Sequence, residues 1–269
     1  MHPIPVRRMR FEVPATFQPA YMAGSASTSY GMTGLGLYVA ILEPFIVKSL
    51  RRVLDRIRDD ALRENVDRFC RQEAQHYMQH DRFNALVLAQ GYDGLEALVQ
   101  GLRDDFEHFL GAKDDRFRVG FIEGFEANTT QGALFLLGSG VFEHPKTDPA
   151  FGALFRWHML EEIEHRDVAF DVYQHLYGDW LYRARMCWVA QAHMATFQDR
   201  CTEVMSKVDV ARYGERYRIT SKDRRQRMLM RAVPRVRSML PSYTPHAYVV
   251  PPQVAVLSAQ LSREAESAT

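Results

Sequence analysis

Two segments of the chain carry a glutamate and a histidine three residues apart. They are Glu73 and His76 in RQEAQHYMQH, and Glu162 and His165 in WHMLEEIEH. Residues three apart lie on one face of an α-helix, and both pairs fall in stripes that are otherwise Phe, Val, Leu and Ala. A carboxylate on a buried stripe is costly unless its charge is compensated. The apolar neighbours therefore favour a metal site over an ordinary salt-bridged helix face, because carboxylate and imidazole together suit a transition metal.

Two other predicted helices supply one glutamate each on an apolar stripe, Glu43 in AILEPF and Glu126 in GFEANTT. One glutamate from each of two helices, plus Glu-x-x-His from each of the other two, is the ligand pattern of dinuclear carboxylate bundles. Four carboxylates would balance two divalent cations, and no lysine or arginine lies on these stripes. Glu123, one turn before Glu126, is an alternative for the same role.

Two more histidines lie one turn from the paired motifs, His80 after His76 and His158 before Glu162. They could be further ligands, proton carriers or hydrogen-bond partners of the ligands. The predicted metal site thus contains Glu43, Glu73, His76, His80, Glu126, His158, Glu162 and His165. The predicted catalytic residues are six of these eight, namely Glu43, Glu73, His76, Glu126, Glu162 and His165. Glu161 and Glu164 flank the second motif and are expected to be solvated.

These residues require long helices to position them, and the hydrophobic periodicity predicts such helices. The four expected bundle helices span about 30–58, 60–90, 114–139 and 149–177, the last beginning at Pro149 with Asp148 as its N-cap. A short helix near 94–110 lies in the long link between the second and third. We therefore predict an all-α, ferritin-like four-helix bundle with one long crossover plus extra C-terminal helices.

The predicted organisation has three parts. Residues 1–28 form an extended, proline-containing arm, 29–210 a ferritin-like metal-binding helical domain, and 211–269 a helical or irregular extension packed on the bundle. The extension contains a basic helix at about 221–239, interrupted by Pro234. A solvated helix packed on the bundle is the simpler interpretation of its charge, although contact with an acidic partner, an anionic substrate group or a membrane surface stays open. A homodimer is also possible.

The composition is that of an ordinary globular protein. The chain has 269 residues, 46% hydrophobic and 25% charged, with a formal net charge of +1, so no global field favours nucleic acid. Its three cysteines are odd in number and lack C-x-x-C spacing, which fits a reducing compartment. We find no secretory signal and no run of about 18 apolar residues, so a cytoplasmic location is expected.

At the residues above, the sequence resembles a bacterial family of predicted metal-dependent hydrolases within the ferritin-like superfamily. The matching stretches are ILEPF, FCRQEAQHYMQHDRFN and WHMLEEIEHRDVAFDVY. Carried over residue by residue, the resemblance implicates the same eight residues as metal ligands. That family usually has glutamate, histidine, an aromatic residue and threonine in its third bundle helix. Here the run is Glu126, Ala127, Asn128 and Thr129, which is a departure on the substrate side.

The donor set leads us to predict an O₂-activating di-iron oxidase or oxygenase acting on a small or amphiphilic organic substrate. Two iron ions are expected, with O₂ as co-substrate and an unspecified electron donor, although manganese or a mixed pair would use the same ligands. Apolar neighbours such as Phe69, Phe83 and Phe135 are expected to line the pocket. The alternative is a dinuclear hydrolase of esters or phosphoesters. A third interpretation is an iron-handling or non-catalytic ferritin-like protein.

Overall fold

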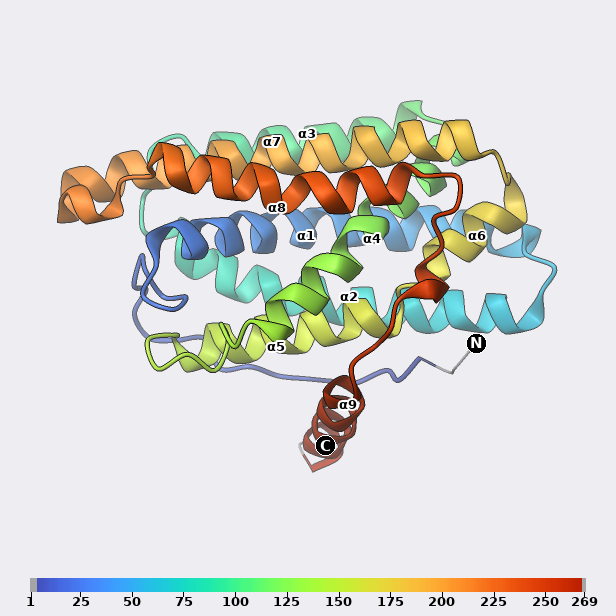
Figure 1. Cartoon of the computed structure of the whole chain (residues 1–269), viewed down its shortest axis with the longest axis horizontal. Coiled ribbons are helices and arrows are strands. Elements are labelled where there is room, and N and C mark those ends of the chain that lie inside the picture. The colour runs from blue at the N-terminus through green and yellow to red at the C-terminus, as the bar shows by residue number, and fades with distance from the viewer. Residues whose placement is uncertain (1–3, 268–269) are drawn as a thin grey trace.

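The computed structural model describes residues 4–267, and these form helices joined by short connections, with no strand among them. The predicted all-α class is confirmed. Figure 1 shows the long helices lying side by side, with the N-terminal arm running along the edge formed by α2 and α5.

A four-helix bundle is formed by α1 (Ala26–Val53), α2 (Asp60–Leu88), α4 (Asp115–Gly138) and α5 (Pro149–Glu164). In each case a side chain accepts hydrogen bonds from the first turn, which satisfies amide groups that a helix leaves unpaired; these caps are Ser25, Asp59, Asp114 and Asp148. The crossover from α2 to α4 contains α3 (Leu95–Ala112). This arrangement agrees with the predicted long crossover and is compatible with a ferritin-like bundle.

The fourth bundle helix is shorter than predicted. The expected helix 149–177 is divided into α5 and α6 (Val168–Leu176), because the backbone leaves helical geometry at His165. No glycine or proline marks this break in the sequence. The break coincides with contacts that the His165 ring makes to Gln72 and to the site carboxylates.

A further long helix, α7 (Trp180–Tyr213), packs against α1 and α4. Its approach to α4 is close enough to require glycine. A Cβ atom added at Gly124 would lie 2.6 Å from the carbonyl oxygen of Met186 and 2.8 Å from Cα of Cys187.

The C-terminal part differs from the prediction in two ways. Helix α8 (Ser221–Met239) continues through Pro234, so the expected interruption is wrong. This helix lies over α4 and α7 (Figure 1) and leaves Met228 and Leu229 exposed. A helix that was not predicted, α9 (Pro252–Ser267), contacts α5. Three short 3₁₀ segments complete the described elements, at Leu54–Arg56, Glu215–Tyr217 and Pro245–Ala247.

The described part of the N-terminal arm is irregular or extended over residues 4–14, forms turns at 19–24 and is part of the packed structure. Residues 1–3 of the predicted arm lie outside the described residues, and α1 begins at Ala26, within the predicted range 1–28. Gln72 and Gln79 of α2 donate to backbone carbonyls of the arm at Pro5 and Met9, at 2.8 and 2.9 Å. Arg7 of the arm is buried against α5. The arm therefore brings a cation to the helices that carry the paired motifs.

One described segment, Ala26–Arg56, is long and apolar enough to cross a membrane by length and composition. A single helix of this kind is weak evidence for a membrane span. In addition, 72% of its most apolar window is buried inside the structure, as expected for a core helix of a bundle.

Candidate metal centre

Seven of the eight predicted ligands converge between the four bundle helices. None of the seven is more than 2% exposed. Three groups of donor atoms lie within 4.8 Å of one another: Glu43, His76 and His158; Glu73, Glu126 and His165; and Glu73, His76 and Glu162. Because Glu73 and His76 each belong to two groups, the groups form one continuous centre.

One half of the centre is built around His165. Its Nε2 lies 3.4 Å from Glu126 Oε2, 3.5 Å from Glu73 Oε1 and 3.6 Å from Glu162 Oε2. Ligands about 2.1 Å from one metal ion are roughly 3–3.5 Å from each other. These separations are therefore close to those of donors that share an ion.

The other half is built around His76 and His158. His76 Nδ1 lies 3.9 Å from Glu43 Oε1 and 3.8 Å from Glu73 Oε2. His158 Nε2 lies 3.6 Å from the same Glu43 oxygen and 2.8 Å from Glu162 Oε1. Glu73 and Glu162 thus face both halves, as bridging carboxylates would.

Many of these donor atoms are buried and have no hydrogen-bond partner among the described residues. They are both oxygens of Glu43, Oε1 of Glu73, Nδ1 of His76, Oε1 of Glu126, Oε2 of Glu162 and Nε2 of His165. Buried polar atoms are normally satisfied, and each unsatisfied one needs an explanation. Their convergence on one volume points to bound cations.

The electrostatics lead to the same conclusion. Burial, and then Glu73 and Glu162, raise the pKa of Glu43 well above its usual value. Burial, and then Glu162, raise the pKa of Glu126 to about 8. Burial opposes the charge of Glu162, but His165 and His158 hold its pKa well below the usual range. The carboxylates therefore cannot all ionise comfortably without added positive charge.

His76 is oriented from behind by Glu161. Its Nε2 lies 3.1 Å from Glu161 Oε2, while Glu161 Oε1 accepts from Trp157 Nε1 at 2.8 Å and from Arg7 Nη1 at 2.9 Å. This leaves His76 Nδ1 facing the centre. The prediction that Glu161 is solvated is wrong, since it is fully buried, and Glu164 is bound to Arg7 at 2.7 Å.

His165 has an equivalent support. Gln72 Oε1 accepts from its Nδ1 at 3.0 Å, which directs Nε2 to the carboxylates. Gln72 is itself held through its amide group by Pro5 O and by Glu164. Hydrogen bonds of this kind fix the tautomer of a histidine ligand. Neither support could be predicted from local sequence patterns, because both depend on contacts with Arg7 and Pro5 of the N-terminal arm.

His80 does not reach the ligand groups. Its Nε2 lies 2.5 Å from His158 Nδ1, so it contacts the ring of a candidate ligand. Of the roles left open for these two histidines, the geometry favours direct ligation for His158 and hydrogen-bonded support for His80. Burial, and then the neighbouring His158, hold the pKa of His80 well below its usual value, so its ring is neutral.

The two glutamates of α4, Glu123 and Glu126, have different partners. Glu126 faces His165, whereas Glu123 is buried in an ion pair with Arg183 at 3.2 Å and accepts from Cys187 Sγ at 3.3 Å. Of the two, Glu126 is the one placed to bind a metal.

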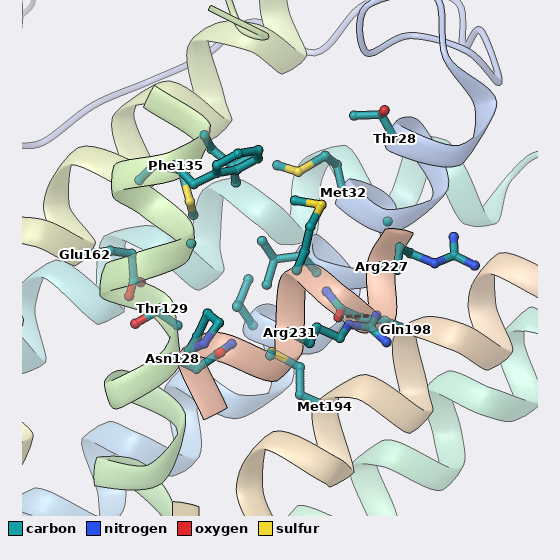
Figure 2. A pocket seen from close by; sticks show the side chains of 18 of the residues that line it. Thr28, Met32, Asn128, Thr129, Phe135, Glu162, Met194, Gln198, Arg227 and Arg231 are labelled. Atoms are coloured by element: carbon teal, nitrogen blue, oxygen red, sulfur yellow. Dashed lines mark hydrogen bonds between the residues drawn. The ribbon is translucent and has the colours of Figure 1, made fainter. Parts of the chain in front are cut away.

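A cavity of about 410 Å³ opens beside the centre. His158 and Glu162 form part of its wall, next to Asn128 and Thr129. Figure 2 shows Glu162, Thr129 and Asn128 on one side of it. Of the two α4 residues that depart from the family's usual run, Ala127 and Asn128, only Asn128 lines this cavity, whereas Ala127 packs with Cys187 and Tyr243.

The predicted aromatic lining is correct for only one residue. Phe135 lines the cavity. Phe69 instead packs on the ring of His165, with centroids 4.5 Å apart, and Phe83 packs on Phe151 in the core.

Comparison with known proteins identifies one family. The model of a family described as "predicted metal-dependent hydrolase" matches residues 5–248. The chain belongs to this family. No curated protein and no solved structure shows a significant match.

Membership of the metal-dependent hydrolase family agrees with the resemblance of the Glu-x-x-His segments and with the groups of possible metal ligands. It does not support the oxidase or oxygenase that we predicted first. The description of the family fits the hydrolase alternative better.

Proposed function

We propose that this member of the family is a hydrolase with two metal ions between α1, α2, α4 and α5. The observation that carries the proposal is the set of unpaired, buried donor atoms, which come from all four helices and converge on one volume. Two divalent cations would neutralise Glu43, Glu73, Glu126 and Glu162. No basic side chain of the described residues forms an ion pair with these four except the histidines of the centre.

The residues divide between the two ions by proximity. Glu43, His76 and His158 would hold one ion. Glu126 and His165 would hold the other, with Glu73 and Glu162 shared between them. When bound, such ions polarise the scissile ester or phosphoester and acidify a water molecule.

The protein itself fixes the donors and shapes the access route. Glu161 and Gln72 hold the rings of His76 and His165, and His80 holds the ring of His158. Thr129 donates to the backbone carbonyl of Glu126 at 3.0 Å and lies on the cavity wall. A substrate in the cavity would approach the centre from the side of His158 and Glu162.

Oxygen-dependent oxidation is the second candidate, because one observation favours it. The centre has four glutamates to three histidines, on helices and away from solvent. A carboxylate-rich donor set stabilises oxidised metal ions, and a dry core protects reactive species from water. Iron would be the expected metal for that reaction.

The two candidates are distinguished by the metal form that is active. Protein is loaded anaerobically with zinc, manganese or ferrous iron, and the esterase and phosphodiesterase rates are measured with chromogenic esters, with and without oxygen. We expect hydrolysis by the zinc or manganese form without oxygen, and its loss in His165→Ala. Inert zinc and manganese forms, together with oxygen consumption and a ferric absorbance band in the ferrous form, would replace the hydrolase by the oxidase.

A further inference from the structure

The cavity beside the metal centre has two chemically different ends. Glu162, His158 and Thr129 are at one end, and Arg227 and Arg231 of α8 are at the other. Figure 2 shows Arg227, Arg231 and Gln198 across the cavity from Glu162. Its volume, about 410 Å³, lies within the range of small-molecule sites.

The wall between the two ends is mainly apolar. Side chains from α1, α4, α5 and α7 form it, namely Met32, Leu35, Val39, Phe135, Met159 and Met194. Such a wall suits an apolar segment of a ligand, because its burial removes apolar surface from water.

The two arginines differ in what they already bind. Arg231 Nη1 donates to both oxygens of Asp199, at 3.0 and 2.9 Å, and its Nη2 donates to Gln198 Oε1 at 3.1 Å. No such hydrogen bond from the Arg227 guanidinium to a side chain is formed among the described residues. The Nε and Nη1 atoms of Arg227 are buried without a partner in the described part of the chain, and the nearest carboxylate oxygen, on Asp199, is 3.8 Å from Nε.

The carboxylate of Asp223, which also lies at this end of the cavity, already accepts hydrogen bonds at the start of α8. It accepts from the backbone amide of Thr220 at 2.9 Å and caps α8. Arg227 therefore lines the cavity with a guanidinium whose Nε and Nη1 have no partner in the described part of the chain, and a guanidinium binds carboxylate or phosphate groups well.

We infer that the substrate is an amphiphile whose anionic end group, a carboxylate or a phosphate, binds Arg227 while its reactive group lies beside Glu162. The apolar wall holds the segment that joins the two. The position of the reactive group rests on the proposed function, whereas recognition of the anion rests on Arg227 alone.

Binding measurements on metal-loaded protein test this inference. After metal content has been measured, octanoate, octyl phosphate and octanol are titrated by calorimetry. We expect at least one anion to bind about tenfold or more tightly than octanol, because hydrogen bonds to charged groups are the stronger ones. Comparison of octanoate with octyl phosphate shows which head group is preferred.

Variants identify the residue responsible. Arg227→Gln should weaken binding of the preferred anion by about tenfold or more and leave octanol unchanged, while Arg227→Lys, which keeps the charge, should lose less. The matched control is Arg224→Gln, since Arg224 is an exposed residue of the same helix, pairs with Glu203 and lies outside this cavity. It should bind all three probes as the unchanged protein does.

Equal binding of octanol and both anions would overturn the inference. So would anion binding that survives Arg227→Gln but is lost in Glu162→Ala, because the anion would then bind at the metal centre. The outcomes remain separable from the proposed function. A protein that takes up no metal but still shows Arg227-dependent anion binding would refute the metal centre and support the anion site. A metal-loaded protein that hydrolyses esters but shows no preference for anions would refute only the inference about Arg227.

Discussion

Glu161→Gln should weaken metal binding without removing any proposed ligand. All three partners of the Glu161 carboxylate are donors: Arg7 Nη1, Trp157 Nε1 and His76 Nε2. A glutamine side chain has one acceptor oxygen, which would remain with Arg7 and Trp157 because both reach the same carboxylate oxygen. Its amide group would then face His76 Nε2.

The amide would require His76 Nε2 to accept a hydrogen bond. The proton of the neutral ring would move to Nδ1, the atom that faces Glu43 and Glu73. A protonated nitrogen cannot bind a metal ion. Loss of comparable hydrogen-bond supports costs about 10–100-fold in metal affinity, which corresponds to about 1.4–2.7 kcal/mol.

Competition with a chromophoric chelator measures this affinity. Glu123→Gln is the matched control, since Glu123 is as buried as Glu161 and also pairs with an arginine, but it contacts no member of the centre. We expect Glu161→Gln to lose affinity and Glu123→Gln to keep it. Equal affinities in the two variants would refute the role assigned to Glu161.

Two further predictions concern stability. Without metals, the folded-state pKa values of Glu126 (about 8) and His76 (about 9) are above their ordinary values, so protonation favours the folded state. The apo melting temperature should therefore rise as pH falls from about 9 to 6.5, more than that of the loaded protein, and a fall over this interval in the apo protein would contradict the account. Gly124→Ala should destabilise the fold by about 3 kcal/mol, since the new methyl group meets the α7 backbone. Gly132→Ala on the same helix meets nothing within 4 Å and should be neutral or stabilising in the same denaturant titration.

The bundle and the convergence of the candidate ligands could be predicted because their signals are local. Spacing of three residues places Glu73 with His76 on one face of a helix, and an apolar stripe shows that the face is buried. The N-cap at Asp148 followed by Pro149 is also readable from a few adjacent residues.

The rest could not be predicted because it depends on contacts between distant parts of the chain. The sequence pattern predicts a solvated Glu161, because the burial of this residue depends on Arg7, which is 154 residues away in sequence. The break at His165 has no local breaker, and α8 remains helical through Pro234. The unpaired donors of Arg227 become significant only when α8 lies against the cavity.

The central claim is a dinuclear metal centre between α1, α2, α4 and α5. Crystallography with anomalous scattering at the absorption edge of the metal found by elemental analysis tests it most directly. We expect two metal peaks per chain, one near Glu43, His76 and His158 and the other near Glu126 and His165, with Glu73 and Glu162 between them. A fully loaded protein with a single peak, or with its metal elsewhere in the chain, would contradict the account.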